Sequence, residues 1–142
     1  MKYKFIPHTA DIKFQAFGGG FEKCFENAGY ALKEVICKEK IKNKIKKEFS
    51  VEGEDFENLL YNFLEEFLFL FETENFIAGR IKIKNSEIKD KGKKLKLKVE
   101  VLGGDSEDYK IDNHVKAITY NDMFIKLDEK KHQYICQVVV DV

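Results

Sequence analysis

Tryptophan is absent from this chain, and proline and arginine each occur once, as Pro7 and Arg80. With a single arginine, the bidentate recognition of phosphate or guanine that this side chain provides is almost excluded. Acidic and basic residues number 25 each, so the formal net charge is zero. This balance argues against a dedicated nucleic-acid-binding protein, which normally carries a clear basic excess.

Cysteine occurs only three times, at Cys24, Cys37 and Cys136. The absence of a C-x-x-C pair excludes a zinc ribbon and a thiol redox motif, and favours reduced, buried thiols in a cytosolic protein. The sequence also lacks the run of about 20 apolar residues needed to cross a bilayer. We therefore expect a soluble cytoplasmic protein without a membrane partner.

Hydrophobic periodicity predicts a single α+β domain over residues 1–142. Apolar residues at helical spacing predict amphipathic helices over 21–37 and from an N-cap at Asp55 through Phe71. Period-two alternation predicts strands at 3–6, 12–17, 44–51, 77–83, 94–101, 117–127 and 133–140. The order of these elements predicts two helices packed on one face of a mainly antiparallel sheet.

The segment from Pro7 to Ile12 is unusually polar for a turn between two strands. His8, Thr9 and Asp11 lie in it, whereas a plain connector needs only Gly, Asn or Asp. A second carboxylate, Asp141, follows an apolar strand end and precedes Val142, whose free carboxylate we expect beside it. Carboxylates held together repel one another unless a cation such as Ca²⁺ or Mg²⁺ neutralises them. Spacing alone leaves an exposed strand-end aspartate as the simpler alternative.

Other motifs favour structural roles. Gly18-Gly19-Gly20 lacks the spacing of a phosphate-binding loop and predicts a strand-to-helix turn. The acidic loop from Asp105 to Asp112 does not match the EF-hand pattern and is predicted to be solvated. No serine lies in a G-x-S-x-G elbow and the histidines lack metal-ligand spacing, so no catalytic residue is predicted.

Four separated segments resemble the archease family. They are His8 to Ile12, with the later Phe25-Glu26-Asn27-Ala28; Asn58 to Leu64; Val115 to Tyr120; and Val138 to Val142. Two departures from the family pattern are Phe63, where tryptophan is common, and Asn121, where a histidine often follows the tyrosine. The acidic loop is also shorter than in the family, so no role is transferred to it or to His114.

This resemblance implies an accessory protein that is not an enzyme. Archeases promote the guanylylation and multiple turnover of the RtcB-type tRNA-splicing ligase, so RNA is expected to be contacted only through the ligase. The resemblance also implies a divalent cation, generally calcium, bound by Asp11, Asp141 and Val142. Lys116 becomes a candidate contact to the ligase or its nucleotide, and His8 and Thr9 become candidates to orient the metal-binding turn.

Two other functions are compatible with the residues alone. A small metal-dependent phosphoesterase would use the same carboxylates, but the sequence offers no second carboxylate pair, activating base or arginine cluster for it. A purely structural binding module would bind no cation.

Overall fold

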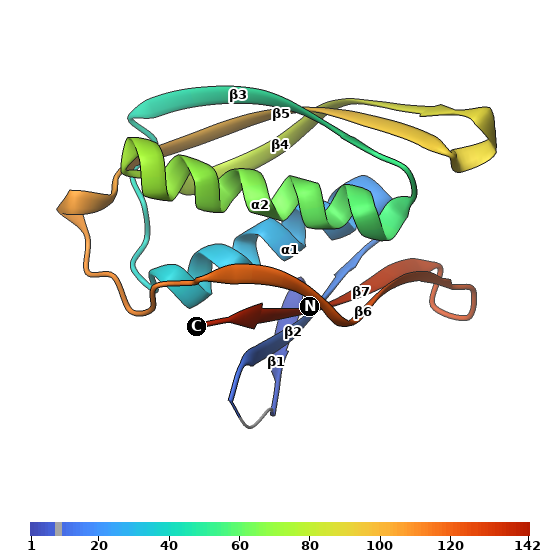
Figure 1. The fold of residues 1–142 in the computed structure, drawn as a ribbon, viewed down its shortest axis with the longest axis horizontal. Coiled ribbons are helices and arrows are strands. Elements are labelled where there is room, and N and C mark those ends of the chain that lie inside the picture. The colour runs from blue at the N-terminus through green and yellow to red at the C-terminus, as the bar shows by residue number, and fades with distance from the viewer. Residues whose placement is uncertain (8–9) are drawn as a thin grey trace.

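A computed structural model describes residues 1–7 and 10–142 of the protein. The described residues form two α-helices and seven β-strands, with short 3-10 turns at Asp90–Gly92 and Ser106–Asp108 (Figure 1). The order is β1 (Tyr3–Ile6), β2 (Ile12–Gly18), α1 (Phe21–Ile36), β3 (Ile45–Gly53), α2 (Phe56–Glu74), β4 (Phe76–Lys89), β5 (Lys94–Asp105), β6 (Ala117–Asp128) and β7 (Gln133–Asp141).

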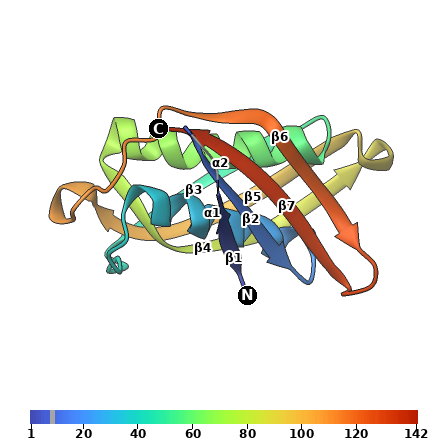
Figure 2. The same ribbon diagram turned by 90° about the horizontal axis from the view of Figure 1, so that it is seen from below.

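The strands form two antiparallel sheets. One has four strands in the order β1-β2-β7-β6, and the other has three in the order β3-β5-β4. The N-terminal hairpin therefore pairs with the last strand of the chain, and Figure 2 shows β2 and β7 side by side. The α+β class predicted from the sequence is confirmed, and the structure adds that the strands divide between two sheets.

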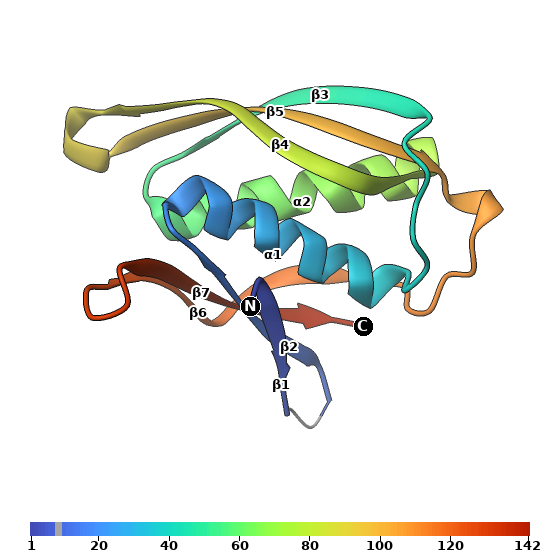
Figure 3. The same cartoon turned by 180° about the vertical axis from the view of Figure 1, so that it is seen from behind.

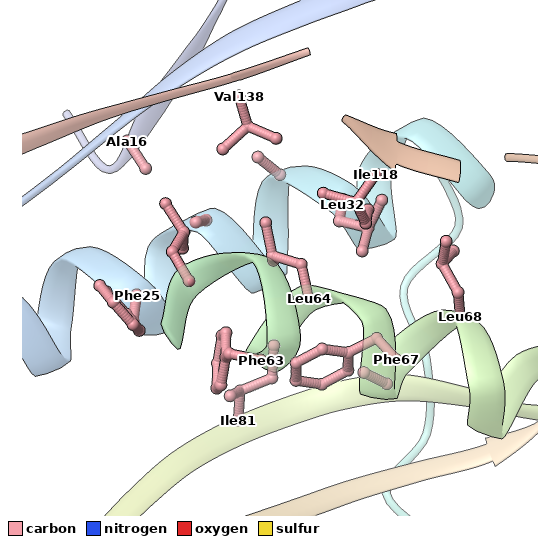
Figure 4. Close-up of a cluster of buried hydrophobic side chains, with 14 of the residues drawn as sticks. Ala16, Phe25, Leu32, Phe63, Leu64, Phe67, Leu68, Ile81, Ile118 and Val138 are labelled. Atoms are coloured by element: carbon pink, nitrogen blue, oxygen red, sulfur yellow. The ribbon is translucent and has the colours of Figure 1, made fainter. Parts of the chain in front are cut away.

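Both helices lie between the two sheets, as Figures 1 and 3 show from opposite sides. Their side chains meet inward-facing residues of each sheet in one buried cluster. Figure 4 shows Ala16 and Val138 on one side of the helices and Ile81 on the other. The core is rich in phenylalanine: the ring of Phe63 lies 5.7 Å from that of Phe25 and 5.1 Å from that of Phe67, measured between centroids.

Local sequence explains where α2 begins and ends. The side chain of Asp55 accepts a hydrogen bond from the amide of Asn58 at 2.7 Å, so the predicted N-cap is confirmed. The helix ends at Asn75, which adopts the left-handed conformation that asparagine tolerates. Between these caps, leucine and phenylalanine recur at helical spacing and bury one face.

Helix α1 carries buried polar side chains that hold the neighbouring strands. The carboxylate of Glu26, only 5% exposed, accepts a hydrogen bond from the amide of Ile83 at 2.8 Å. The amide of Asn27 donates to the carbonyl of Phe17 at 2.6 Å. A register shift between Ile83 and Asn85 breaks the period-two pattern of β4, which continues to Lys89 beyond the predicted end at Ile83.

Other expectations concern cysteines and membrane spans. Cys24, Cys37 and Cys136 are buried free thiols, as predicted. A hydrogen bond with Cys24, followed by burial, raises the pKa of the Cys136 thiol, which keeps this thiol protonated. Among the described residues, no helix combines the length and the apolar character that a membrane span requires.

Candidate functional site

The pairing of β2 with β7 brings the segments that carry Asp11 and Asp141 to the same end of the four-stranded sheet. Ile12 pairs with Val140 in an antiparallel register, and the same register carried one residue further sets Asp11 opposite Asp141. Residues directly opposite each other in such a pair have Cα atoms about 5 Å apart and point to the same face. We therefore expect the two carboxylates to lie near each other where β2 begins and β7 ends.

Lys116 lies at the same end of this sheet. Its amide donates a hydrogen bond to the carbonyl of Asp141 at 2.7 Å, and Ala117, the next residue, pairs with Asp141. Lys116 itself precedes β6 and is exposed. Its side chain is therefore accessible at the end of the sheet that carries Asp141, as a contact to another molecule would require.

Val142 and the opening turn complete the set of predicted residues. Val142 is half-buried and packs against the core, which positions the main chain directly after Asp141. Figure 2 shows this end of β7 next to the start of β6. His8 and Thr9, predicted to support the turn, lie outside the described residues, so their supporting role stays a prediction.

The donors at this site suit a hard divalent cation. Asp11 and Asp141 are half-buried, and among the described residues neither side chain has an ion-pair or hydrogen-bonding partner. Carboxylate oxygens held side by side favour Ca²⁺ or Mg²⁺ over softer metals. Within the described part of the chain no three His, Cys, Asp or Glu side chains form a metal-binding group. Main-chain oxygens and external ligands would therefore have to complete the coordination.

Lys13 and Asp122 flank this site and were not identified from the sequence. The ammonium of Lys13 lies 3.1 Å from the carboxylate of Asp122, which sits at a positive φ of 54° where β6 departs from regular pairing between Thr119 and Phe124. Strand alternation could have placed Lys13 on the same face as Asp11, two residues earlier. The irregularity that presents Asp122 has no comparable signal in the sequence.

The acidic loop makes local contacts. Asp105 accepts a hydrogen bond from the amide of Glu107 at 2.9 Å, and Asp112 accepts one from the amide of Lys38 at 2.8 Å. His114 is exposed, with its ring 6.3 Å from that of Phe71. These carboxylates bind backbone amides of the loop and of the segment after α1, which accounts for them without a ligand.

The fold and the site define a small α+β protein with a carboxylate pair at one end of a four-stranded sheet. A model of the Archease protein family matches residues 3–142. The chain belongs to this family, as the sequence resemblance indicated.

Similar proteins agree along the whole chain. "Protein archease" of Pyrococcus abyssi is 39% identical over 143 residues, covering 99% of each chain. "Protein archease" of Archaeoglobus fulgidus is 35% identical over 144 residues, covering 100% of each. The solution structure of Methanobacterium thermoautotrophicum protein 1598 superposes with a TM-score of 0.83 at 28% identity, covering 99% of this chain and 98% of that one.

Family membership distinguishes an accessory protein from the enzyme considered in the sequence analysis. As an archease, the protein is an accessory protein and not an enzyme.

Proposed function

We propose that this protein activates an RtcB-type tRNA-splicing ligase in the cytoplasm, by promoting the guanylylation of the ligase and its multiple turnover. Family membership supports an accessory role of this kind. The observation that supports the proposal is the register of β2 and β7, in which Ile12, the residue after Asp11, pairs with Val140, the residue before Asp141. This end of the four-stranded sheet carries carboxylates from distant parts of the chain, which suits it to present negative charge, or a cation that they bind, to a partner.

In this proposal Asp11 and Asp141 hold a divalent cation, Ca²⁺ or another hard cation such as Mg²⁺. A main-chain oxygen of Val142 is the third donor. When bound, the cation adds positive charge that attracts phosphate oxygens and neutralises the two carboxylates. The exposed ammonium of Lys116, next to Asp141, contacts the ligase or the phosphates of its nucleotide.

Each residue has a distinct part in this arrangement. Asp141 lies in β7 and Asp11 directly precedes β2, so each aspartate is attached to a strand of the same sheet. The hydrogen bond from the amide of Lys116 to the carbonyl of Asp141 ties β6 to the same point. His8 and Thr9 are proposed to order the turn that presents Asp11.

The test measures how strongly this protein stimulates multiple-turnover ligation by a cognate RtcB-type ligase. The wild type is compared with the Asp11→Asn and Asp141→Asn variants. We expect stimulation to fall at least tenfold in either variant, because one cation ligand of opposite charge is lost. Asp90→Asn is the matched control, since Asp90 is exposed in the β4–β5 hairpin on the other sheet. Full stimulation by both site variants would overturn the proposal.

Calorimetry separates this function from a purely structural binding module. The proposed function predicts heat of Ca²⁺ binding to the wild type that is absent from the Asp11→Asn variant. A binding module with no cation would show no such heat in either protein.

A further inference from the structure

Acidic and basic side chains are concentrated on different elements of the molecule, although the whole chain has no net charge. Helix α2 carries five glutamates and no basic residue. The three-stranded sheet instead turns basic side chains outward, because Ile81, Ile83 and Val99 alternate with them and are buried. Figures 1 and 3 show that this outer side faces away from both helices.

We define the basic face as the outward side chains of Arg80, Lys82, Lys84 and Lys98. All four are exposed, and within the described part of the chain none forms an ion pair. The pairing partners of Lys98 are the uncharged Ser50 and Asn85. The basic face therefore holds uncompensated positive charge.

Carboxylates also lie on this outward side, and they are engaged by a lysine. Glu48 is exposed, pairs with Glu100 across β3 and β5, and lies 3.2 Å from the ammonium of Lys46. Glu100 pairs with Lys82 across the strands, and its carboxylate lies 3.4 Å from the ammonium of Lys46. Arg80, Lys82 and Lys84, with Glu100 and Leu102, line a hollow of about 170 Å³. Lys46 reduces the repulsion that Glu100 would exert on an anion in this hollow.

We propose that the basic face binds the phosphate backbone of folded RNA. Outward residues of one strand recur about every 6.8 Å, and adjacent strands lie about 4.8 Å apart. The sheet thus holds its cations in a fixed array, which matches the repeated charges of a polyanion better than a single small anion. That the polyanion is RNA rests on the proposed function, in which the ligase joins RNA. A direct contact of this kind differs from the expectation, drawn from the family resemblance, that RNA is contacted only through the ligase.

The residue types of the basic face also indicate which part of the RNA it contacts. Among the described outward residues of β3, β4 and β5 there is no aromatic ring on which a base could stack. Arg80 is the single arginine of the chain, so bidentate reading of bases is not available beyond one position. The face therefore binds phosphates of a folded stem without reading its sequence.

The experiment measures fluorescence anisotropy of a labelled RNA stem-loop with the isolated protein, without ligase or divalent cation, over a range of salt concentrations. The variant combines Arg80→Gln, Lys82→Gln and Lys84→Gln. We expect its affinity to fall at least about tenfold and the slope of log K against log salt to fall by about 3, one per lost phosphate contact. Lys98→Gln alone should lower the slope by about 1.

The matched control combines Lys126→Gln, Lys130→Gln and Lys131→Gln, which removes the same charge from the exposed β6–β7 hairpin of the other sheet. We expect it to bind RNA as the wild type does. Equal losses in both triple variants, no RNA binding by the wild type at low salt, or tighter binding of polyglutamate than of RNA would each overturn the proposal. Because ligase and cation are absent, none of these results affects the test of Asp11 and Asp141.

Discussion

The ring of Tyr61 on α2 stacks on the ring of Tyr120 on β6, with centroids 4.4 Å apart and planes inclined by only 8°. The side-chain amide of Asn58 donates a hydrogen bond to the hydroxyl of Tyr120 at 2.9 Å. These contacts join the helical layer to the strand that begins next to Lys116. They lie on the protein surface, where Tyr120 is 52% exposed.

We predict that Tyr120→Ala lowers the free energy of unfolding by about 1.5 kcal/mol, because it removes an aromatic pair and a hydrogen bond. Tyr120→Phe keeps the stack and should cost only about 0.5 kcal/mol. Urea denaturation followed by circular dichroism measures both values. Equal losses in the two variants would show that the hydrogen bond, and not the stack, carries the stabilisation.

The glycine triplet between β2 and α1 gives a second prediction. A Cβ atom at Gly18 would lie 2.3 Å from the amide nitrogen of Cys24, whereas one at Gly19 meets nothing within 4 Å. Gly18→Ala should therefore destabilise the protein by about 2 kcal/mol or more, since backbone must move. Gly19→Ala should stabilise it by about 0.5 kcal/mol, because the unfolded chain loses freedom. Similar midpoints of thermal unfolding for both variants would contradict this account.

Glu66 on α2 makes stability depend on pH. Burial, and then the charge of Glu65, raise the pKa of Glu66 above its ordinary value of 4.5. A raised pKa means that the contribution of Glu66 is most favourable below the unfolded pKa and is lost as the pH rises through the folded pKa. Glu66→Gln should therefore stabilise the protein at pH 7, by about 0.5 kcal/mol or less for a surface change, and not at pH 3.

Chemical denaturation of the wild type and Glu66→Gln at both pH values tests this prediction. Glu72→Gln, on the exposed part of the same helix, is the control for a general loss of negative charge. An equal gain from the control at pH 7 would assign the effect to the net charge of α2.

The proposed cation site predicts a linked change in thermal stability. A cation at 100 times its dissociation constant stabilises the folded state by about 2.7 kcal/mol. We expect Ca²⁺ to raise the unfolding temperature of the wild type and a chelator to reverse this, with no response in Asp141→Asn. Without cation, Asp141→Asn should be at least as stable as the wild type, because one of two adjacent like charges is gone. A Ca²⁺ response of wild-type size in this variant would contradict the assignment of Asp141.

Sequence patterns predicted the elements because their causes are local. The Asp55 cap depends on an amide three residues away, and the buried face of α2 follows from helical spacing. Strand alternation likewise placed β2, β5 and β7 within a few residues of their observed ends. The bulge near Lys84 hid the second half of β4, because an extra residue reverses the alternation.

The candidate site could be predicted only in part from sequence patterns. Asp11, Asp141 and Lys116 were selected one by one from polar segments and from a family resemblance. Nothing in their spacing shows that they meet, because strand pairing between distant segments is set by the packing of the whole core. Asp122 was missed because its position depends on an irregularity in β6.

By itself, the sequence determined the α+β class, the starts of the helices and the neutral total charge, since each follows from local pattern or simple composition. Only the tertiary structure decided that the strands divide into two sheets around the helices. It also decided that Ile12 pairs with Val140, next to Asp11 and Asp141, and that basic residues gather on the outer side of β4 and β5. The physical reason is that burying both helices between sheets fixes which strands pair, and pairing fixes which side chains share a face.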